Sequence, residues 1–134
     1  MALFGLGNLN PMARKAAAKL VAEGCDVAVI NPRFTKPLDA GTHEFFGGGA
    51  DVVMTLEDHA LAGGYGSAVL ELFSEKGITT PLVRIGWPDQ FIEHASSQDE
   101  LRRRYGLTVE NIVARVKAQF VEAPAAAKLI AMAS

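Results

Sequence analysis

Apolar residues along the chain form short continuous runs that alternate with segments of helical period, a pattern typical of repeated strand–helix units. The runs end at glycine, proline or asparagine, which favour turns. Strands are therefore expected at residues 2–6, 27–30, 51–56 and 81–85. The 27–30 run is apolar at every position, which is typical of a central strand covered by helices on both faces.

Between these runs, apolar residues recur at every third or fourth position, as on the buried stripe of an amphipathic helix. The first helix is expected to have Asn10 as its cap and Pro11 in its first turn, and to stop at Gly24. Its stripe consists of Met12, Ala13, Ala16, Ala17, Leu20 and Val21. Further helices are expected within 38–46, before Gly77, over 98–105 behind a Ser97–Glu100 capping box, and from Val109, capped by Thr108, to about Phe120, where Pro124 ends the helix.

Strands that alternate with helices predict an α/β fold in three layers, with a mainly parallel sheet of about four strands between two layers of helices. The chain has 134 residues, the size of one domain. Residues 1–122 are expected to form that domain. Residues 123–134 are expected to be a tail, either helical or disordered.

Composition narrows the classes of function. Hydrophobic residues make up 49% of the chain and charged residues 21%, enough to bury a core and too apolar for intrinsic disorder. Thirteen basic and fifteen acidic residues leave a net charge of −2, so a basic surface for nucleic acid is not expected. No stretch approaches the roughly 20 apolar residues of a membrane-spanning helix, and no secretory leader is recognised. The single Cys25 cannot form an intrachain disulfide, which fits a cytoplasmic protein.

The first glycine loop follows the 2–6 strand and contains Gly5, Gly7 and Asn8. It begins like the G-x-G-x-x-G motif of dinucleotide-binding folds, but Asn10 stands where the third glycine is needed. A tight turn that leads into a helix is the simpler interpretation.

The second glycine loop, which follows the third strand, holds Gly63, Gly64, Tyr65, Gly66 and Ser67. It lacks the lysine of a phosphate-binding P-loop, and Ser67 does not stand in the G-x-S-x-G pattern of a nucleophile elbow. Its position before a helix leaves two interpretations: a site for a small anion, or close backbone packing within the fold or across a subunit interface.

Glu57, Asp58 and His59 form an acidic–imidazole cluster at the end of the third strand. They would suit a general base with an orienting carboxylate, or polar loop residues that cap the next element. His43 and His94 lie too far from His59 in sequence for a helical metal site, so all three histidines are interpreted as structural.

Three consecutive arginines, Arg102, Arg103 and Arg104, stand beside Asp99 and Glu100. A solvated, salt-bridged helix face is the default interpretation of such a run, and a phosphate clamp is the alternative.

Three segments resemble the C-terminal, transketolase-type domain of the 1-deoxy-D-xylulose-5-phosphate synthase family: MTLEDHALAGGYGSAV (54–69), VINPRFTKPLD (29–39) and RIGWPDQFIEH (84–94). The resemblance runs in order from about residue 2 to residue 116. It implies a parent enzyme that uses thiamine diphosphate and Mg²⁺ to decarboxylate pyruvate and join its two-carbon unit to glyceraldehyde 3-phosphate, for isoprenoid, thiamine and pyridoxal synthesis.

In that family the cofactor lies between upstream domains, which carry the catalytic and metal-binding residues. The resemblance therefore implies that this chain contributes no catalytic, cofactor-binding or metal-binding residue. Its expected part is architectural, in contact with the upstream domains and with the second subunit of a homodimer.

The resemblance also implies a sheet order of 2-1-3-4 for the four strands. The family's further antiparallel strand would lie beside residues 27–30 and is missing here, so an exposed edge prone to pairing with another chain is expected there. The same order places the topological switch point between the first and third strands. A cleft is expected there, where the loop with Gly5, Gly7 and Asn8 converges with residues 57–67.

Two other functions remain open on the residues alone. One is a stand-alone flavodoxin-like domain that binds a small anion or nucleotide at the glycine loops. The other is a non-catalytic interaction module. Bound phosphate at the second loop would favour the anion-binding domain. A large apolar two-fold interface without ligand would favour either the architectural domain of the synthase family or the interaction module.

Overall fold

The computed structural model describes residues 1–94 and 96–131. The elements in chain order are β1 (Ala2–Gly5), a 3₁₀ turn η1 (Gly7–Leu9), α1 (Asn10–Ala22), β2 (Ala28–Ile30), α2 (Ala40–Gly49), β3 (Val53–Ala60), α3 (Tyr65–Lys76), β4 (Leu82–Trp87), α4 (Gln98–Arg104) and α5 (Val109–Ala131).

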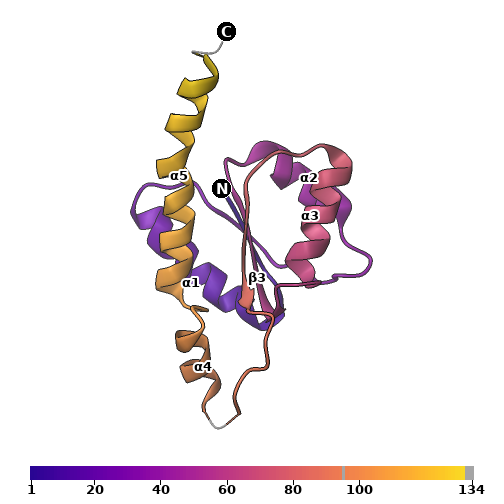
Figure 1. Cartoon of the computed structure of the whole chain (residues 1–134), viewed down its shortest axis with the longest axis vertical. Coiled ribbons are helices and arrows are strands. Elements are labelled where there is room, and N and C mark those ends of the chain that lie inside the picture. Colours follow the sequence, from indigo (N-terminus) through magenta and orange to yellow (C-terminus); the bar gives the residue numbers. More distant parts are fainter. Residues whose placement is uncertain (95, 132–134) are drawn as a thin grey trace.

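The strands form a four-stranded parallel sheet in the order β2-β1-β3-β4. Helices α1 and α5 cover one face of it, and α2 and α3 cover the other (Figure 1). The three-layer α/β fold and the strand order expected from the sequence are confirmed. The interpretation of residues 27–30 as a central strand is wrong, because β2 is an edge strand whose residues are only half-buried.

Alternate residues of β1 enter two separate hydrophobic cores, as the pleat of a strand requires. Leu3 lies in the core beneath α1 and α5, and Phe4 lies in the core beneath α2 and α3. Helix α1 packs closely because the residues it turns to the sheet are mostly alanines. Val21, expected on this stripe, is 55% exposed, since it faces the groove beside β2, where the sheet ends.

Several helix ends form as the sequence predicts. Gly77 ends α3 in the left-handed conformation, with φ of 64°. The Ser97 hydroxyl accepts a hydrogen bond from the Glu100 backbone N–H at 3.2 Å and caps α4. The Thr108 hydroxyl accepts one from the Asn111 N–H, also at 3.2 Å, and caps α5.

Asn10 does not cap α1, contrary to expectation. The 3₁₀ turn η1 already winds the chain from Gly7, and the Asn10 N–H donates to the Gly7 carbonyl. Asn10 is therefore the first helical residue, behind Leu9 as cap, and its side chain makes no capping hydrogen bond.

Two helices are longer than the sequence predicts. Helix α2 continues through the three glycines to Gly49, where a shorter helix within 38–46 was expected; the Asp39 carboxylate caps it by accepting from the Thr42 N–H at 3.1 Å. Helix α5 continues to Ala131, so the expected end before Pro124 is wrong. Alanine has the highest helix propensity, and alanines surround this proline.

Strand β3 also runs further than expected, to Ala60 rather than to Leu56. Pairing with β4 resumes at Ala60 and Trp87 after a register irregularity. Glu57, Asp58 and His59 consequently belong to a strand, not to a loop. Their side chains are presented to different sides of its carboxyl end.

Gly5 allows α1 to approach the sheet. A Cβ atom at Gly5 would lie 2.7 Å from the Asn10 Cα and 2.9 Å from the Ala13 Cβ, both closer than packed atoms come. Gly48, on the exposed side of α2, has open space instead.

We expect Gly5→Ala to lower the free energy of unfolding by about 1–3 kcal/mol, because the new methyl group meets backbone that must shift. The matched change Gly48→Ala should raise it by about 0.5–1 kcal/mol, because alanine loses less backbone entropy in a helix. Urea unfolding of both variants checks this. A Gly5→Ala variant as stable as the parent would contradict the close approach of α1.

Candidate functional site

The carboxyl ends of β1 and β3 lie side by side, and the predicted cleft opens there. The Leu6 N–H donates to the Leu56 carbonyl at 2.9 Å, and the Asn8 side-chain amide donates to the Asp58 carboxylate at 2.5 Å. A pocket of about 360 Å³ occupies this position. Its lining residues are Leu6, Thr35, Lys36, Glu57, His59, Gly63, Gly64, Tyr65 and Ala68.

Half of the predicted site residues line this pocket, namely Glu57, His59, Gly63, Gly64 and Tyr65. Gly5, Gly7, Asn8, Gly66 and Ser67 lie nearby in the fold but outside its lining. Sequence reasoning missed Thr35 and Lys36, because the stretch that follows β2 carries no clear period. The proline at position 37 is the one signal that a fixed turn lies there.

The Glu57 carboxylate, buried completely, occupies the amino end of α3. It accepts hydrogen bonds from the Tyr65 N–H at 2.6 Å and from the Gly66 N–H at 2.9 Å. These are the free N–H groups at which a helix attracts anions. The anion that faces the second glycine loop in this structure is thus a side chain of the protein itself.

Glu57 explains the glycine at position 64, because a Cβ there would collide with its carboxylate. A Cβ at Gly86 would lie 2.8 Å from the His59 carbonyl oxygen, 2.9 Å from the Leu61 Cδ2 and 3.0 Å from the Glu57 Cγ. Gly66 has a different reason, since its Cβ would lie 2.6 Å from the Thr55 hydroxyl. The loop therefore shows the close backbone packing that the sequence left as one of two interpretations.

A buried series of hydrogen bonds runs from Tyr65 to His43 and the amino end of α2. The Tyr65 hydroxyl lies 2.7 Å from Nε2 of His43, and Nδ1 of His43 lies 2.6 Å from the Asp39 carbonyl oxygen. Burial, with the Glu57 charge nearby, raises the pKa of Tyr65, so its hydroxyl stays protonated and donates to Nε2. Nδ1–H then donates to Asp39, and His43 is neutral. It is a structural histidine, stacked on Phe4 with ring centroids 4.6 Å apart.

Asp58 gathers donors from three other elements on the opposite side of β3. Its carboxylate accepts from the Trp87 indole N–H at 2.6 Å, from Arg102 at 2.8 Å and from Asn8 at 2.5 Å. Burial alone would raise the pKa of Asp58, but the hydrogen bonds from Trp87, Asn8 and Arg102 outweigh it and lower the pKa below its usual range. The Asp58 carboxylate therefore connects β3 to η1, β4 and α4.

The three arginines of α4 each meet a carboxylate. Arg102 pairs with Asp58, Arg103 pairs with Glu100, and Arg104 pairs with Glu93. Arg103 and Arg104 are largely exposed, as on the solvated face expected from the sequence. Arg102 differs because its side chain is mostly buried against Asp58.

The chemistry available at the pocket is that of binding. Lys36 and His59 bring groups that would attract an anion, and Thr35 brings a hydroxyl. Glu57 and Tyr65 are committed to internal hydrogen bonds. Within residues 1–94 and 96–131, no three histidine, cysteine or acidic side chains gather as metal ligands. No helix in the same part of the chain is both long and apolar enough to cross a membrane.

We expect Glu57→Ala to lower the free energy of unfolding by about 2–4 kcal/mol, because two buried N–H groups lose their acceptor. Glu71→Ala, an exposed change on the same helix, should alter it by less than about 0.5 kcal/mol. Urea unfolding at neutral pH compares the two. Equal effects would mean that Glu57 does not anchor α3.

His43 predicts a pH dependence of stability. Burial lowers the pKa of His43 below that of a free histidine, about 6.5, so the unfolded chain takes up the proton first. The contribution of His43 to the free energy of unfolding is therefore fully present above about pH 6.5, and it is lost as the pH falls below that value. Relative to His43→Gln, the parent chain should lose up to about 1.4 kcal/mol more per pH unit in that range. Urea unfolding at several pH values tests this, and equal slopes would contradict it.

Comparison with known proteins agrees with the geometry. The sequence model of the family described as "Transketolase, C-terminal domain" matches residues 1–112. The chain is 50% identical over 111 residues to the 1-deoxy-D-xylulose-5-phosphate synthase of Methylacidiphilum infernorum, covering 83% of this chain and 18% of that protein. The same enzyme of Thioalkalivibrio sulfidiphilus is 43% identical over 124 residues, covering 92% and 18%.

Among solved structures, a "Split gene transketolase, inactive beta4 tetramer" superposes with a TM-score of 0.81 at 34% identity, over 90% of this chain and 39% of that one. This chain spans about a fifth of the length of the curated relatives that it matches. The family match extends over most of the sequence and the strand order agrees with it. The chain therefore belongs to the transketolase C-terminal domain family.

Proposed function

We propose that this chain is the C-terminal domain of a 1-deoxy-D-xylulose-5-phosphate synthase. The parent enzyme would convert pyruvate and glyceraldehyde 3-phosphate to 1-deoxy-D-xylulose 5-phosphate and CO₂, a precursor for isoprenoids, thiamine and pyridoxal. The observation that carries the proposal is the 50% identity to such an enzyme over 111 residues. The protein would work in the cytoplasm.

The part of this chain in that enzyme is architectural. Its buried carboxylate, Glu57, holds the amino end of α3, and Asp58 holds Trp87 and Arg102. Neither is free to act as a base or to bind a metal. The donor set of the described residues thus does not fit thiamine diphosphate with Mg²⁺, which we assign to the upstream domains of the parent. Residues 1–122 would form the folded unit that those domains and a second subunit contact.

A small-anion site is the second candidate, favoured by the pocket that Lys36 and His59 both line. It is the weaker one, since Glu57 already satisfies the N–H groups of α3 that would have bound the anion. The third candidate is a free-standing interaction module. The parent's upstream domains, encoded in the same reading frame, would separate it from the first.

We expect the isolated chain to give no heat with thiamine diphosphate and Mg²⁺ in calorimetry and no product from pyruvate and glyceraldehyde 3-phosphate. Added to a 1-deoxy-D-xylulose-5-phosphate synthase that lacks its own C-terminal domain, it should restore part of the turnover, because it supplies the missing support. Saturable cofactor binding or turnover by the chain alone would overturn the architectural role.

The Gly5→Ala variant tests whether the restored turnover depends on a stable fold of this domain, because we expect it to lower the free energy of unfolding at a residue outside the pocket lining. The Gly5→Ala variant should restore less activity than the unmutated 134-residue chain does. If millimolar inorganic phosphate raised the free energy of unfolding of the unmutated chain but not that of Lys36→Ala, the small-anion function would be favoured instead.

A further inference from the structure

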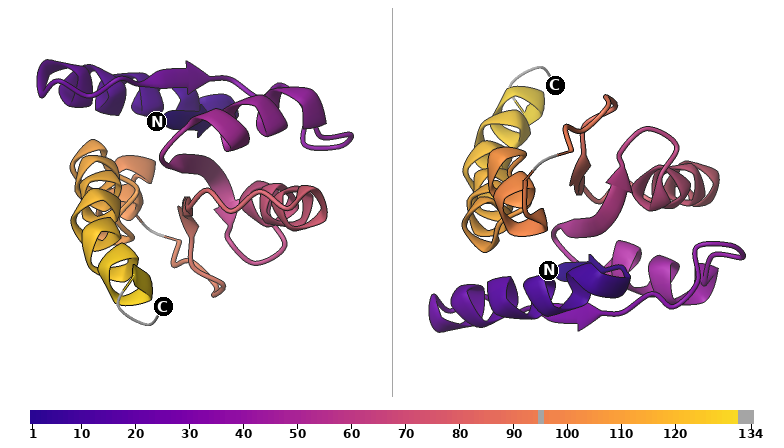
Figure 2. Two further views of the ribbon diagram at one scale, coloured as in Figure 1. Left: turned by 90° about the horizontal axis from the view of Figure 1, so that it is seen from above. Right: turned by 90° about the horizontal axis from the view of Figure 1, so that it is seen from below.

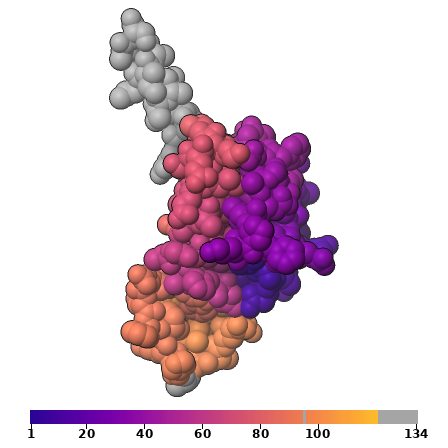
Figure 3. Space-filling view, turned by 90° about the vertical axis from the view of Figure 1, so that its right-hand side faces the viewer, coloured from indigo at the N-terminus to yellow at the C-terminus, as the bar shows by residue number. Residues whose placement is uncertain are grey.

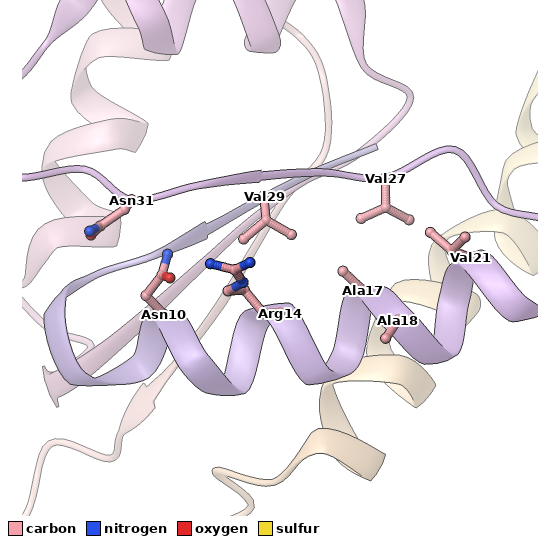
Figure 4. Close-up of a pocket in the computed structure, with 8 residues that line it drawn as sticks. All are labelled: Asn10, Arg14, Ala17, Ala18, Val21, Val27, Val29 and Asn31. Atoms are coloured by element: carbon pink, nitrogen blue, oxygen red, sulfur yellow. The ribbon is translucent and has the colours of Figure 1, made fainter.

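Two open surfaces of the described chain lie at opposite edges of the sheet. Beside β2, Val27 and Val29 project toward α1 at a groove of about 680 Å³ (Figure 4). That groove borders the edge where the family's further strand would lie, and its lining is about as polar as it is apolar. The second surface follows β4, at the other end of the strand order. Figure 2 shows α1 and β2, in indigo and purple, on one side of the molecule and the segment after β4, in orange, on the other.

The surface after β4 combines an exposed aromatic side chain with an apolar pocket. Phe91 is fully exposed on the loop between β4 and α4. A pocket of about 290 Å³ opens on the same loop, and its lining is mainly apolar. Single exposed phenylalanines are common on protein surfaces, but one beside an apolar pocket is typical of an interaction surface. The pocket is lined by Trp87, Ile92, Glu93, His94, Gln98 and Leu101. We call Phe91 together with this pocket the β4–α4 surface.

The back of the pocket is held by contacts beneath it. The Trp87 indole N–H donates to the Asp58 carboxylate at 2.6 Å, and the Trp87 ring packs edge-on against Tyr105, with ring centroids 5.7 Å apart. Arg102, the residue after Leu101, pairs with the same carboxylate at 2.8 Å. The pocket is therefore already formed in this chain, and a partner would not have to order it.

The loop that carries Phe91 is anchored on both sides of this residue. The Gln90 side-chain amide donates to the Tyr105 hydroxyl at 3.3 Å. The Glu93 carboxylate pairs with Arg104 of α4 at 2.7 Å. In this conformation Phe91 stays fully exposed. A group that buries its ring has to come from outside the described residues.

The ion pairs around α4 leave acidic groups over. The two exposed arginines of α4 each pair with a glutamate. Asp89 and Asp99 are exposed, and neither forms an ion pair with any residue that the structure describes. A partner that fits this surface would therefore bring basic groups as well as apolar ones.

The size of the relatives indicates what this partner is. This chain spans about a fifth of their length, so most of the proposed parent enzyme lies outside it. We propose that the upstream domains of the parent enzyme dock on the β4–α4 surface. Phe91 is buried among their side chains, one of their apolar side chains enters the pocket, and a lysine or arginine of theirs faces Asp89. The inference rests on the function proposed above and adds the place of contact to it.

We expect the 134-residue chain to bind a 1-deoxy-D-xylulose-5-phosphate synthase that lacks its own C-terminal domain, with a micromolar Kd in titration calorimetry. Phe91→Ser should raise the Kd at least tenfold, because a large apolar side chain at the centre of an interface carries much of the binding free energy. Leu70→Ser, at an exposed leucine of α3, is the matched control and should leave the Kd unchanged. Circular dichroism confirms that both variants are folded.

The charge at Asp89 is tested separately. Asp89→Asn should raise the Kd about threefold at low salt and by less at about 0.5 M salt, which screens exposed charges. Glu71→Gln, which removes an exposed charge from α3, is its control and should not change the Kd.

Hydrogen exchange of the chain, free and in the complex, locates the contact without any substitution. The backbone amides of residues 89–94 and 97–101 should exchange several-fold more slowly in the complex. A complex that is as tight with Phe91→Ser as without it, or that protects only other parts of the chain, overturns the docking surface and leaves the proposed function standing. If the unmutated chain forms no complex up to about 100 µM, the proposed function itself is contradicted, and the docking surface with it.

Discussion

The Glu57 carboxylate joins the carboxyl end of β3 to the first turn of α3, and much of the surrounding sequence follows from that contact. A buried charge is tolerated when it is hydrogen-bonded, and two backbone N–H groups at a helix end provide this. The carboxylate needs space, which Gly64 leaves because it has no side chain. The glycine-rich loop thus binds a carboxylate of the protein itself, that of Glu57.

Polar side chains at this end of the sheet are used mainly to hold elements together. On the α2–α3 face, seen in Figure 3, the buried chain from Tyr65 through His43 to Asp39 connects the two helices. On the other side Asp58 connects β3 to α4. A fold that uses its switch point this way offers surfaces to neighbouring domains more readily than it offers reactive groups.

Sequence reasoning identified the α/β class and the main strands because apolar runs and turn residues are local signals. The strand order came from the family resemblance, because the periodicity of apolar residues carries no information about which strands are neighbours. The same resemblance placed residues 27–30 at an edge of the sheet, in place of the central position inferred from their apolar run. The sequence predicted where the candidate site lies, but not what its side chains do. Glu57, Asp58 and His59 were recognised at a strand end, yet the partners of Glu57 and Asp58 lie 8 to 50 positions away from them in the chain. His43 was interpreted as structural from the spacing of the histidines, but its partners Tyr65 and Phe4 could not be predicted, because packing brings them together.

Helix α4 has none of its residues buried. Ion pairs attach it to the sheet, through Arg102 and Asp58, and to the preceding loop, through Arg104 and Glu93. Such a segment opens locally at a much smaller free energy than the core strands. Its backbone amides should exchange with solvent deuterons well before those of β1 and β3, and added salt, which screens the exposed pair, should speed that exchange. The chain thus combines a buried sheet with an internal helix, α4, that is expected to open locally before the sheet does.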